Sequence, residues 1–361
     1  MQSNSENGLA PPLRQPAIDD GTFQRRIWLV VFAACVVVVV WRLSEVILVA
    51  FGAMLLAILL RALASRLRAR SKLPDLLAVA MVVLALIAIA GAIAWLLGSR
   101  LMVQFHTLAD QLPKSLSGLA IEWRATPWGN WLLEFSKDLD YTAATSRLAA
   151  GITAWVGISI RAITYLGLLL FAAVYLAAQP GRYRQGILLL APPNRRERFG
   201  AILDLMGVTL NRWLVGQTIT MAVVGALTGV GLLVLGIDAP LALGLIAGIF
   251  AFVPYVGPVV AAVPGVLMAA TLGTAPALYA VALYAGVHFI EGNLITPIVQ
   301  AEAIELPPVL TLFSALVFGV LLGPVGVLLA APLLVVLLVA VNTLYLEDVL
   351  GEPRAWPPSY E

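Results

Sequence analysis

Long apolar runs separated by short charged segments dominate the sequence. Six runs stand out, at residues 27–41, 46–60, 76–97, 213–237, 239–290 and 306–346. The last two contain no Asp, Glu, Lys or Arg at all. Since about 20 apolar residues cross a bilayer as a helix, the pattern predicts an all-α, polytopic membrane protein.

The run at residues 76–97 is continuously apolar, which excludes a barrel of strands with alternating polarity. The two runs before it are short and are separated by RLSE at residues 42–45. They predict a tight hairpin of two spans, with one long helix as the alternative. The 26 residues before them are polar, and the first run has no small-residue cleavage site. It is therefore interpreted as a retained span and not as a signal peptide.

Changes in polarity divide the chain into segments. We predict a polar N-terminus (1–26), three spans (27–98), an amphipathic extracytoplasmic segment (99–150), a fourth span (151–178), a basic cytoplasmic segment (179–212), a C-terminal core (213–346) and a tail (347–361). Residues 99–150 carry five acids and five bases. Five of the nine tryptophans lie between Trp95 and Trp155, which is typical of a segment at the membrane interface.

The distribution of basic residues predicts the orientation. Residues 1–26, 61–72 and 179–212 hold three, five and six Lys or Arg, and all fourteen fall on one side if the spans alternate. Basic loops remain in the cytoplasm, so both termini are expected there.

Composition supports the membrane class and narrows the chemistry. The chain is 61% apolar and 12% charged, with a mean hydropathy of +0.96. A single Cys35 and two histidines, His106 and His288, exclude a disulfide framework and a multi-histidine metal site. There is no Walker A, HExxH or GxSxG motif. The sequence therefore predicts a protein that is not an enzyme, with no cofactor, no metal and no nucleic-acid partner.

Two C-terminal runs are interrupted by proline and glycine. Residues 239–272 contain PYVGP (Pro254, Tyr255, Gly257, Pro258) and Pro264, and residues 306–346 contain GPVG (Gly323, Gly326) and Pro332. The sequences at the two interruptions are weakly similar to each other. Broken segments at matching positions of two repeats point to the binding site of a transporter. Re-entrant segments would make the repeats inverted, and crossing segments would make them parallel; chance proline kinks are the third interpretation.

Between these runs lies HFIEGNLITPIVQ, with two ionisable residues. His288 and Glu291 are three residues apart, so on a helix they share a face. Ionisable groups inside membrane segments tend to face cavities and mark substrate or ion paths. Burial favours a neutral carboxyl group and histidine changes charge near neutral pH, so the pair suits proton-coupled transport. The alternative is that both residues end a helix at the water interface.

Several uncharged groups accompany the pair. Asn293, Thr296 and Gln217 offer hydrogen bonds, and Pro297 prevents a simple helix. Gln217 is interpreted either as a contact between helices or as a cavity-lining residue. The GxxxG pairs Gly225/Gly229, Gly244/Gly248 and Gly319/Gly323 predict close helix packing and not a specific dimer interface.

The C-terminal half resembles the autoinducer-2 exporter family, also called the PerM-like permeases. The resemblance rests on NRWLVGQ, LVLGIDAPLALGLIAGIFAFVPYVGP, EGNLITPIVQ, LPPVL and GPVGVLLAAPL, over roughly residues 180–350. The matching positions are Gly216, Gln217, Pro254, Tyr255, Gly257, Pro258, Glu291, Asn293, Thr296, Pro297, Pro308, Gly323, Gly326 and Pro332. One departure is Gln300-Ala301-Glu302, where the family often has glycine followed by a basic residue.

This resemblance implies a protein of the bacterial inner (cytoplasmic) membrane with about eight helices. It also implies a homo-oligomer, and export of a quorum-sensing molecule or sodium–proton exchange. We predict a secondary permease for a small polar molecule, ion-coupled and embedded in membrane lipids. Its path would lie at the two breaks, with Glu291 as the protonatable or cation-binding group and His288 as its modulator. The alternatives are a sodium–proton antiporter and a membrane scaffold that transports nothing.

Overall fold

The structure, a computed structural model, describes most of the apolar part of the chain. It covers residues 42–71, 73–124, 160–299 and 306–352, together with Trp28, Val31, Phe32, Cys35 and Val38. Within these ranges the residues form helices joined by short turns, and no strand is present. The all-α fold class is confirmed.

The chain divides into two units, Met1–Ile47 and Leu48–Glu361. In the first unit, the few described residues before Arg42 are helical and exposed. Most of the first apolar run lies outside the described residues. The choice between a hairpin of two spans and one long helix therefore stays a prediction.

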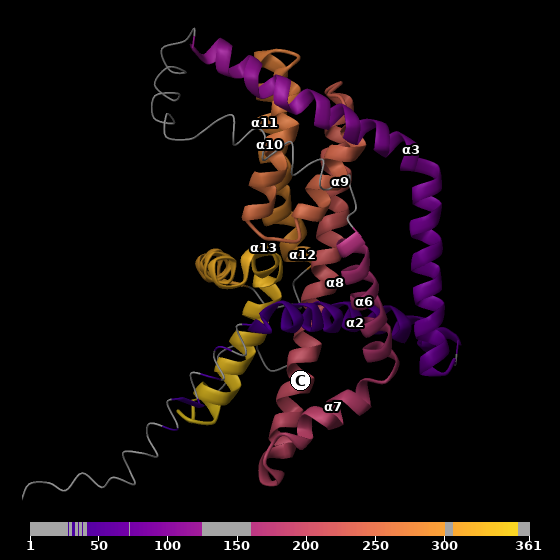
Figure 1. The fold of residues 1–361 in the computed structure, drawn as a ribbon, viewed down its shortest axis with the longest axis vertical. Helices are drawn as coiled ribbons and strands as arrows, with labels where there is room; N and C mark the ends of the chain where they lie inside the picture. Colours follow the sequence, from indigo (N-terminus) through magenta and orange to yellow (C-terminus); the bar gives the residue numbers. More distant parts are fainter. Residues whose placement is uncertain are drawn as a thin grey trace, which may run out of the picture. The chain divides into compact units, whose positions relative to one another are not determined.

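Most helices belong to the second unit (Figure 1). They are α2 (Ser44–Ser71, which begins in the first unit), α3 (Asp75–Arg124), α6 (Ile160–Ala178), α7 (Pro180–Leu189), η1 (Pro193–Arg195), α8 (Arg196–Val234), α9 (Pro240–Phe250), α10 (Val256–Ala270), α11 (Thr274–Ile290), η2 (Glu291–Ile295), α12 (Thr296–Val299), α13 (Pro308–Ala340) and η3 (Val341–Glu347). The element η1 is a 3₁₀-helix, and η2 and η3 are π-helices.

Five helices among the described residues are long and apolar enough to cross a membrane. They lie in Ser44–Ala69, Asp75–Leu108, Pro193–Val234, Thr274–Val299 and Pro308–Glu347. A sixth arises if α6 and α7, which meet at an angle of 89°, form one span. The predicted number of eight spans is not confirmed.

Several helices continue well past the apolar runs that predicted them. Helix α3 has 50 residues and extends through the first part of the amphipathic segment, and α8 begins at Arg196, inside the basic segment. Charged residues end an apolar run but do not end the helix, because Arg and Glu are good helix formers, as are Leu and Ala. The polarity changes at residues 98 and 212 therefore fall inside helices.

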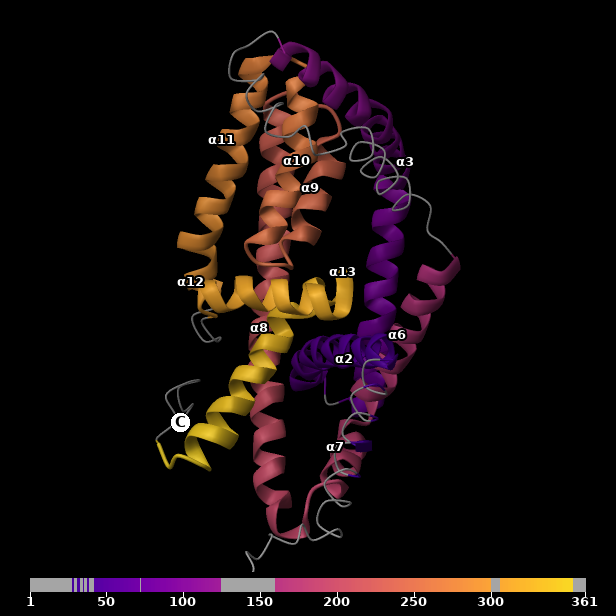
Figure 2. The ribbon, with the colours of Figure 1, turned by 60° about the vertical axis from the view of Figure 1, so that its left-hand side comes forward.

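The first broken run folds into a helical hairpin made of α9 and α10. The end of α8, the start of α9 and the end of α10 share one hydrophobic cluster, which contains Leu232, Leu243 and Met268. Helices α9 and α10 also contact each other (Figures 1 and 2). The hairpin thus begins and ends at the same end of α8.

Helix α3 covers that end of the hairpin. Figure 2 shows its second half leaning over α9 and α10, and Leu108 belongs to the same hydrophobic cluster. The side-chain Oε1 of Gln104 accepts a hydrogen bond of 3.0 Å from the backbone N–H of Ala242, in the first turn of α9. Ala239 has no side-chain oxygen with which to cap α9. Gln104 therefore satisfies a helix-end donor from another helix.

The second broken run bends at Gly323, inside α13. Its φ of 70° and ψ of −159° are accessible to glycine and strained for other residues. The two halves then pack on each other, because a Cβ at Gly326 would lie 2.1 Å from the carbonyl oxygen of Phe318 and one at Gly319 would lie 2.8 Å from Val327. Both predicted breaks are present, and both bring a glycine against a phenylalanine carbonyl, Phe250 in the first and Phe318 in the second.

The first two GxxxG pairs pack α8 against α9. A Cβ at Gly225 would lie 3.0 Å from the carbonyl oxygen of Gly244, and one at Gly248 would lie 3.2 Å from the Cα of Gly225. A Cβ at Gly244 would lie 2.8 Å from the Cα of Gly229. The predicted role in close helix packing is confirmed within one chain.

A cluster of charges joins the start of α8 to the end of the C-terminal helices. Arg198 donates to Glu347 at 2.5 Å and to Asp348 at 2.8 Å, and also to the backbone carbonyl of Thr343. These charged side chains are between about one fifth and two fifths exposed, so solvent weakens their attraction. The cluster fixes η3 beside the first turns of α8.

We expect Arg198→Ala to release η3 with little effect on global stability, since exposed ion pairs contribute only about 0–1 kcal/mol. Limited proteolysis is the measurement, with faster cleavage after Ala340 as the expected result. High salt should produce part of the same effect in the unmodified protein. Arg195→Ala is the matched control, because Arg195 has no side-chain partner among the described residues. Equal protection in both variants would contradict this role.

Candidate functional site

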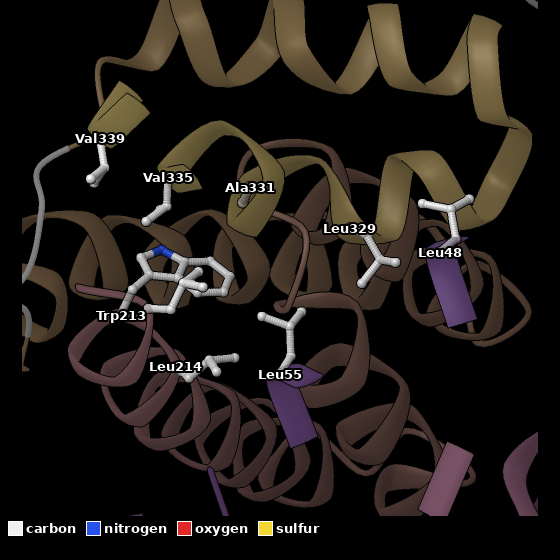
Figure 3. Close-up of a cluster of buried hydrophobic side chains, with 9 residues drawn as sticks. Leu48, Leu55, Trp213, Leu214, Leu329, Ala331, Val335 and Val339 are labelled. Atoms are coloured by element: carbon white, nitrogen blue, oxygen red, sulfur yellow. The ribbon is translucent and has the colours of Figure 1, made fainter. Parts of the chain in front are cut away.

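Trp213 on α8 is the point where the two broken segments meet. It is 1% exposed, and its ring lies 5.7 Å from that of Phe252, edge to face, in the turn of the α9–α10 hairpin. Leu329 and Val335, from the second half of α13, belong to the same cluster (Figure 3). Leu322, next to Gly323, packs against it as well.

The turn between α9 and α10 is strained at Tyr255. Tyr255 has a φ of 64° and a ψ of −48°, and the N–H of Val256 donates to the carbonyl of Pro254 at 2.7 Å. This is a γ-turn of the rare, strained kind. Two residues later a Cβ at Gly257 would lie only 1.8 Å from the carbonyl oxygen of Phe250. Strain of this kind often accompanies function, and here it lies on predicted site residues.

Gln217 on α8 forms a hydrogen bond with the same turn. Its side-chain Nε2 donates a hydrogen bond of 2.6 Å to the backbone carbonyl of Ala251, and the residue is 3% exposed. Ala251 follows the last residue of α9, where backbone carbonyls lose their helical partners. Of the two roles predicted for Gln217, the contact between helices is present.

We expect Gln217→Leu to destabilise the protein by about 1–3 kcal/mol, because it leaves the Ala251 carbonyl buried without this donor. Thermal unfolding in detergent is the measurement. Thr218→Val is the control, since Thr218 bonds only the carbonyl of Leu214 in its own helix. A loss of stability no larger than that of the control would show that the amide does not hold the turn.

Glu291 is buried at the point where α11 changes to a π-helix. It is 8% exposed and is the only charged side chain among the buried residues of the described part of the chain. The N–H of Thr296 donates to the Glu291 carbonyl, five residues back. Pro297 follows and has no N–H to continue the regular pattern. π-Helical turns are frequent at functional sites.

Two ionisable residues lie near the Glu291 carboxylate. His288 Nδ1 lies 3.0 Å from Glu291 Oε2, and the histidine side chain is 45% exposed while that of Glu291 is 10% exposed. Tyr255, in the turn of the first break, lies within electrostatic reach of Glu291. The buried carboxylate therefore contacts an exposed histidine and lies within electrostatic reach of the strained turn.

The remaining predicted residues divide into two groups. Pro254, Gly257 and Gly326 are partly or fully buried in the two breaks. Asn293 and Pro297 are exposed, and the Asn293 amide donates to the carbonyl of Phe289 in its own helix. Asn293 is thus not directed toward Glu291. Pro258, Thr296 and Gly323 are partly exposed.

The hydropathy pattern did not reveal the buried polar face of α8. Thr209, Thr220 and Thr228 are each no more than 1% exposed. Their spacing places them within one third of the helix circumference, together with Trp213 and Gln217. The signal was the 3.6-residue period, which was not applied to polar residues inside an apolar run.

Long apolar helices, with a helical hairpin in the first broken run and a buried carboxylate at a helix break, are the features of a multi-pass membrane protein. Residues 27–346 match the model of the AI-2E family transporter. The chain belongs to this family, and the resemblance found in the sequence is confirmed.

Curated relatives agree with this assignment. The chain is 31% identical over 167 residues to the putative transport protein YrrI of Bacillus subtilis, covering 46% of this chain and 47% of YrrI. It is 26% identical over 277 residues to the putative transport protein YueF of the same organism, covering 72% and 74%. It is 27% identical over 174 residues to the AI-2 transport protein TqsA of Escherichia coli, covering 48% and 49%. In these matches the chain spans about half the length of YrrI and of TqsA.

Proposed function

We propose that the protein is a secondary permease that moves a small polar molecule across the bacterial cytoplasmic membrane. Glu291 is its protonatable group. The observation that carries the proposal is the burial of Glu291, a carboxylate at the start of a π-helical break and within electrostatic reach of the strained turn at Tyr255. An ionisable group held at such a cost inside a membrane protein is expected to act on the transported ion or molecule.

The orientation follows from the basic residues. We assign the end of α8 that carries Arg195, Arg196 and Arg198 to the cytoplasm, because basic loops remain on that side. Both termini are then cytoplasmic, and the α9–α10 hairpin opens on the opposite side. The exposed apolar faces contact lipid or another copy of the chain in a homo-oligomer.

The first substrate to test is AI-2, the molecule named for the relative TqsA. A small polar molecule needs hydrogen-bonding groups along its path. Gln217 is buried and bonds the turn at Ala251, and Thr296 is partly exposed on α12, which contacts α8. His288 is exposed beside Glu291 and would modulate its charge. Sodium–proton exchange is the second candidate, supported only by the single buried carboxylate.

The experiment uses purified protein in liposomes that hold a pH-sensitive dye. We expect AI-2 to cross only when the protein is present, and its movement to change the internal pH. A pH change driven by sodium without AI-2 movement would favour the antiporter. Neither response from folded protein would overturn the permease and favour a scaffold.

A further inference from the structure

Three threonines on the inner face of α8 differ from other helical threonines. Thr218, Thr311 and Thr343 each donate to the carbonyl four residues earlier in their own helix. Thr209, Thr220 and Thr228 are each no more than 1% exposed, yet their hydroxyls have no hydrogen-bond partner among the described residues. Burial therefore does not explain the difference, because Thr311 and Thr343 are also buried.

A fourth buried hydroxyl belongs to Tyr284 on α11, which packs against the cluster that contains Val224 of α8. The Tyr284 oxygen is buried and also has no partner among the described residues. It fits against Gly265, where a Cβ would lie 2.2 Å from it. We call Thr209, Thr220, Thr228 and Tyr284 the hydroxyl track. Buried hydroxyls without partners are costly, and in native proteins they usually mark a bound water or a ligand.

The register of α8 and α11 aligns the hydroxyl track with Glu291. The two helices are antiparallel neighbours, with a Cβ at Gly231 only 2.4 Å from Leu283, and with Val224 and Val287 in one cluster. Leu283, Val287 and Glu291 recur every four residues and share a face. Continuing this register puts Glu291 level with Thr220, and η2 contacts α8.

The hydroxyl track is about as long as the hydrocarbon core of a bilayer is thick. Nineteen residues separate Thr209 from Thr228, which is about 28 Å at the rise of an α-helix. The hydrocarbon core of a bilayer is about 30 Å thick. Gln217 lies between Thr209 and Thr220, and Tyr284 lies at about the level of Thr228. The hydroxyls thus occur on both sides of Glu291.

We propose that the hydroxyl track is a water-filled path that delivers protons to Glu291. Hydroxyl groups donate and accept without carrying charge, so they hold water without binding an ion strongly. Among the described residues, the titratable groups facing Glu291 are His288 and Tyr255; α12 and the part of α8 level with Glu291 carry none. The inference rests on the proposed role of Glu291, and it names the proton as the coupling ion.

Thiol labelling tests hydration of the track. In a Cys35→Ser background, Thr220→Cys and Thr228→Cys would be exposed to 2-aminoethyl methanethiosulfonate, which reacts with thiolates. Burial in apolar surroundings suppresses the thiolate, so we expect labelling about tenfold or more faster than for Leu232→Cys, which is buried off the track. Ile219→Cys, facing outward on α8, is the second control.

A second test uses Thr220→Val and Thr228→Val, which keep the shape of threonine and remove the hydroxyl. Their thermal midpoints test hydration even where the reagent does not fit or a cysteine variant does not fold. In a hydrated track we expect Tm to stay the same or to fall. A higher Tm in both variants, with labelling no faster than at Leu232→Cys, would show a dry interior and overturn the proposal. Neither measurement depends on transport. A hydrated track in a protein that does not move AI-2 would therefore contradict the proposed permease function and leave the water-filled path supported.

Discussion

The Glu291→Gln variant is expected to lose proton-coupled transport in proteoliposomes, down to the level of liposomes without protein. Glutamine has nearly the same volume as glutamate and keeps a polar group beside His288, so the helices should still pack. It cannot take up and release a proton, which is the step assigned to Glu291. The measurement is the flux of AI-2 together with the internal pH, at equal amounts of incorporated protein.

Two variants separate this role from a general effect of charge. Glu197→Gln removes an exposed carboxylate from the first turn of α8 and should leave transport unchanged. Glu291→Asp keeps the carboxylate on a shorter side chain and should retain part of the activity. Normal pH-dependent flux in Glu291→Gln would remove this residue from the mechanism.

Gly257→Ala should be the most disruptive small substitution in the α9–α10 hairpin. The added methyl group would lie 1.8 Å from the carbonyl oxygen of Phe250 and 2.6 Å from its carbon, both backbone atoms that have little freedom to move. Forced overpacking of this kind costs about 1–3 kcal/mol and occasionally more. We expect a lower thermal midpoint and loss of transport, because the turn that carries Tyr255 would open.

The control for this variant is Gly286→Ala, in the middle of α11. A Cβ there meets nothing within 4 Å, so alanine should stabilise the helix by up to about 1 kcal/mol. Gly326→Ala tests the second break in the same way, since its Cβ would lie 2.1 Å from the Phe318 carbonyl oxygen. Stability of Gly257→Ala equal to that of Gly286→Ala would mean that the hairpin is not closed by this contact.

Proline and glycine made the broken segments predictable. Pro254 and Gly257 in the first run, and Gly323 in the second, interrupt apolar stretches that would otherwise continue as helix, and the structure bends at both positions. The hairpin formed by residues 239–272 was not predictable, because it depends on contacts between distant residues. Leu232 and Met268 meet at one end of α8 although 36 residues separate them in the sequence.

The candidate site was predictable only in part. The lack of basic residues near Glu291 indicated an unusual carboxylate, and the structure buries it. The same pattern suggested that Asn293 would join it, but Asn293 bonds its own helix on an exposed face. The π-helical turn at Glu291–Ile295 shifts the register of the residues after Glu291, and sequence spacing assumes a regular helix.

The hydroxyls on α8 show a further limit of hydropathy patterns. Threonine scarcely lowers the hydropathy of an apolar run, so Thr220 and Thr228 did not separate from their neighbours. Whether a helical threonine bonds its own backbone depends on its rotamer and not on its position in the sequence. Only the structure distinguishes Thr228 from Thr343, which are equally buried.

Infrared difference spectroscopy of the carboxyl group on Glu291 follows the proposed proton directly. Spectra of reconstituted protein with and without AI-2, recorded as the pH is lowered, are compared between the unmodified chain and Glu291→Gln. We predict a band of a protonated carboxylic acid that responds to AI-2 and is absent from the variant. An unchanged carboxylate at every pH at which AI-2 still crosses the membrane would contradict a proton-carrying role for Glu291.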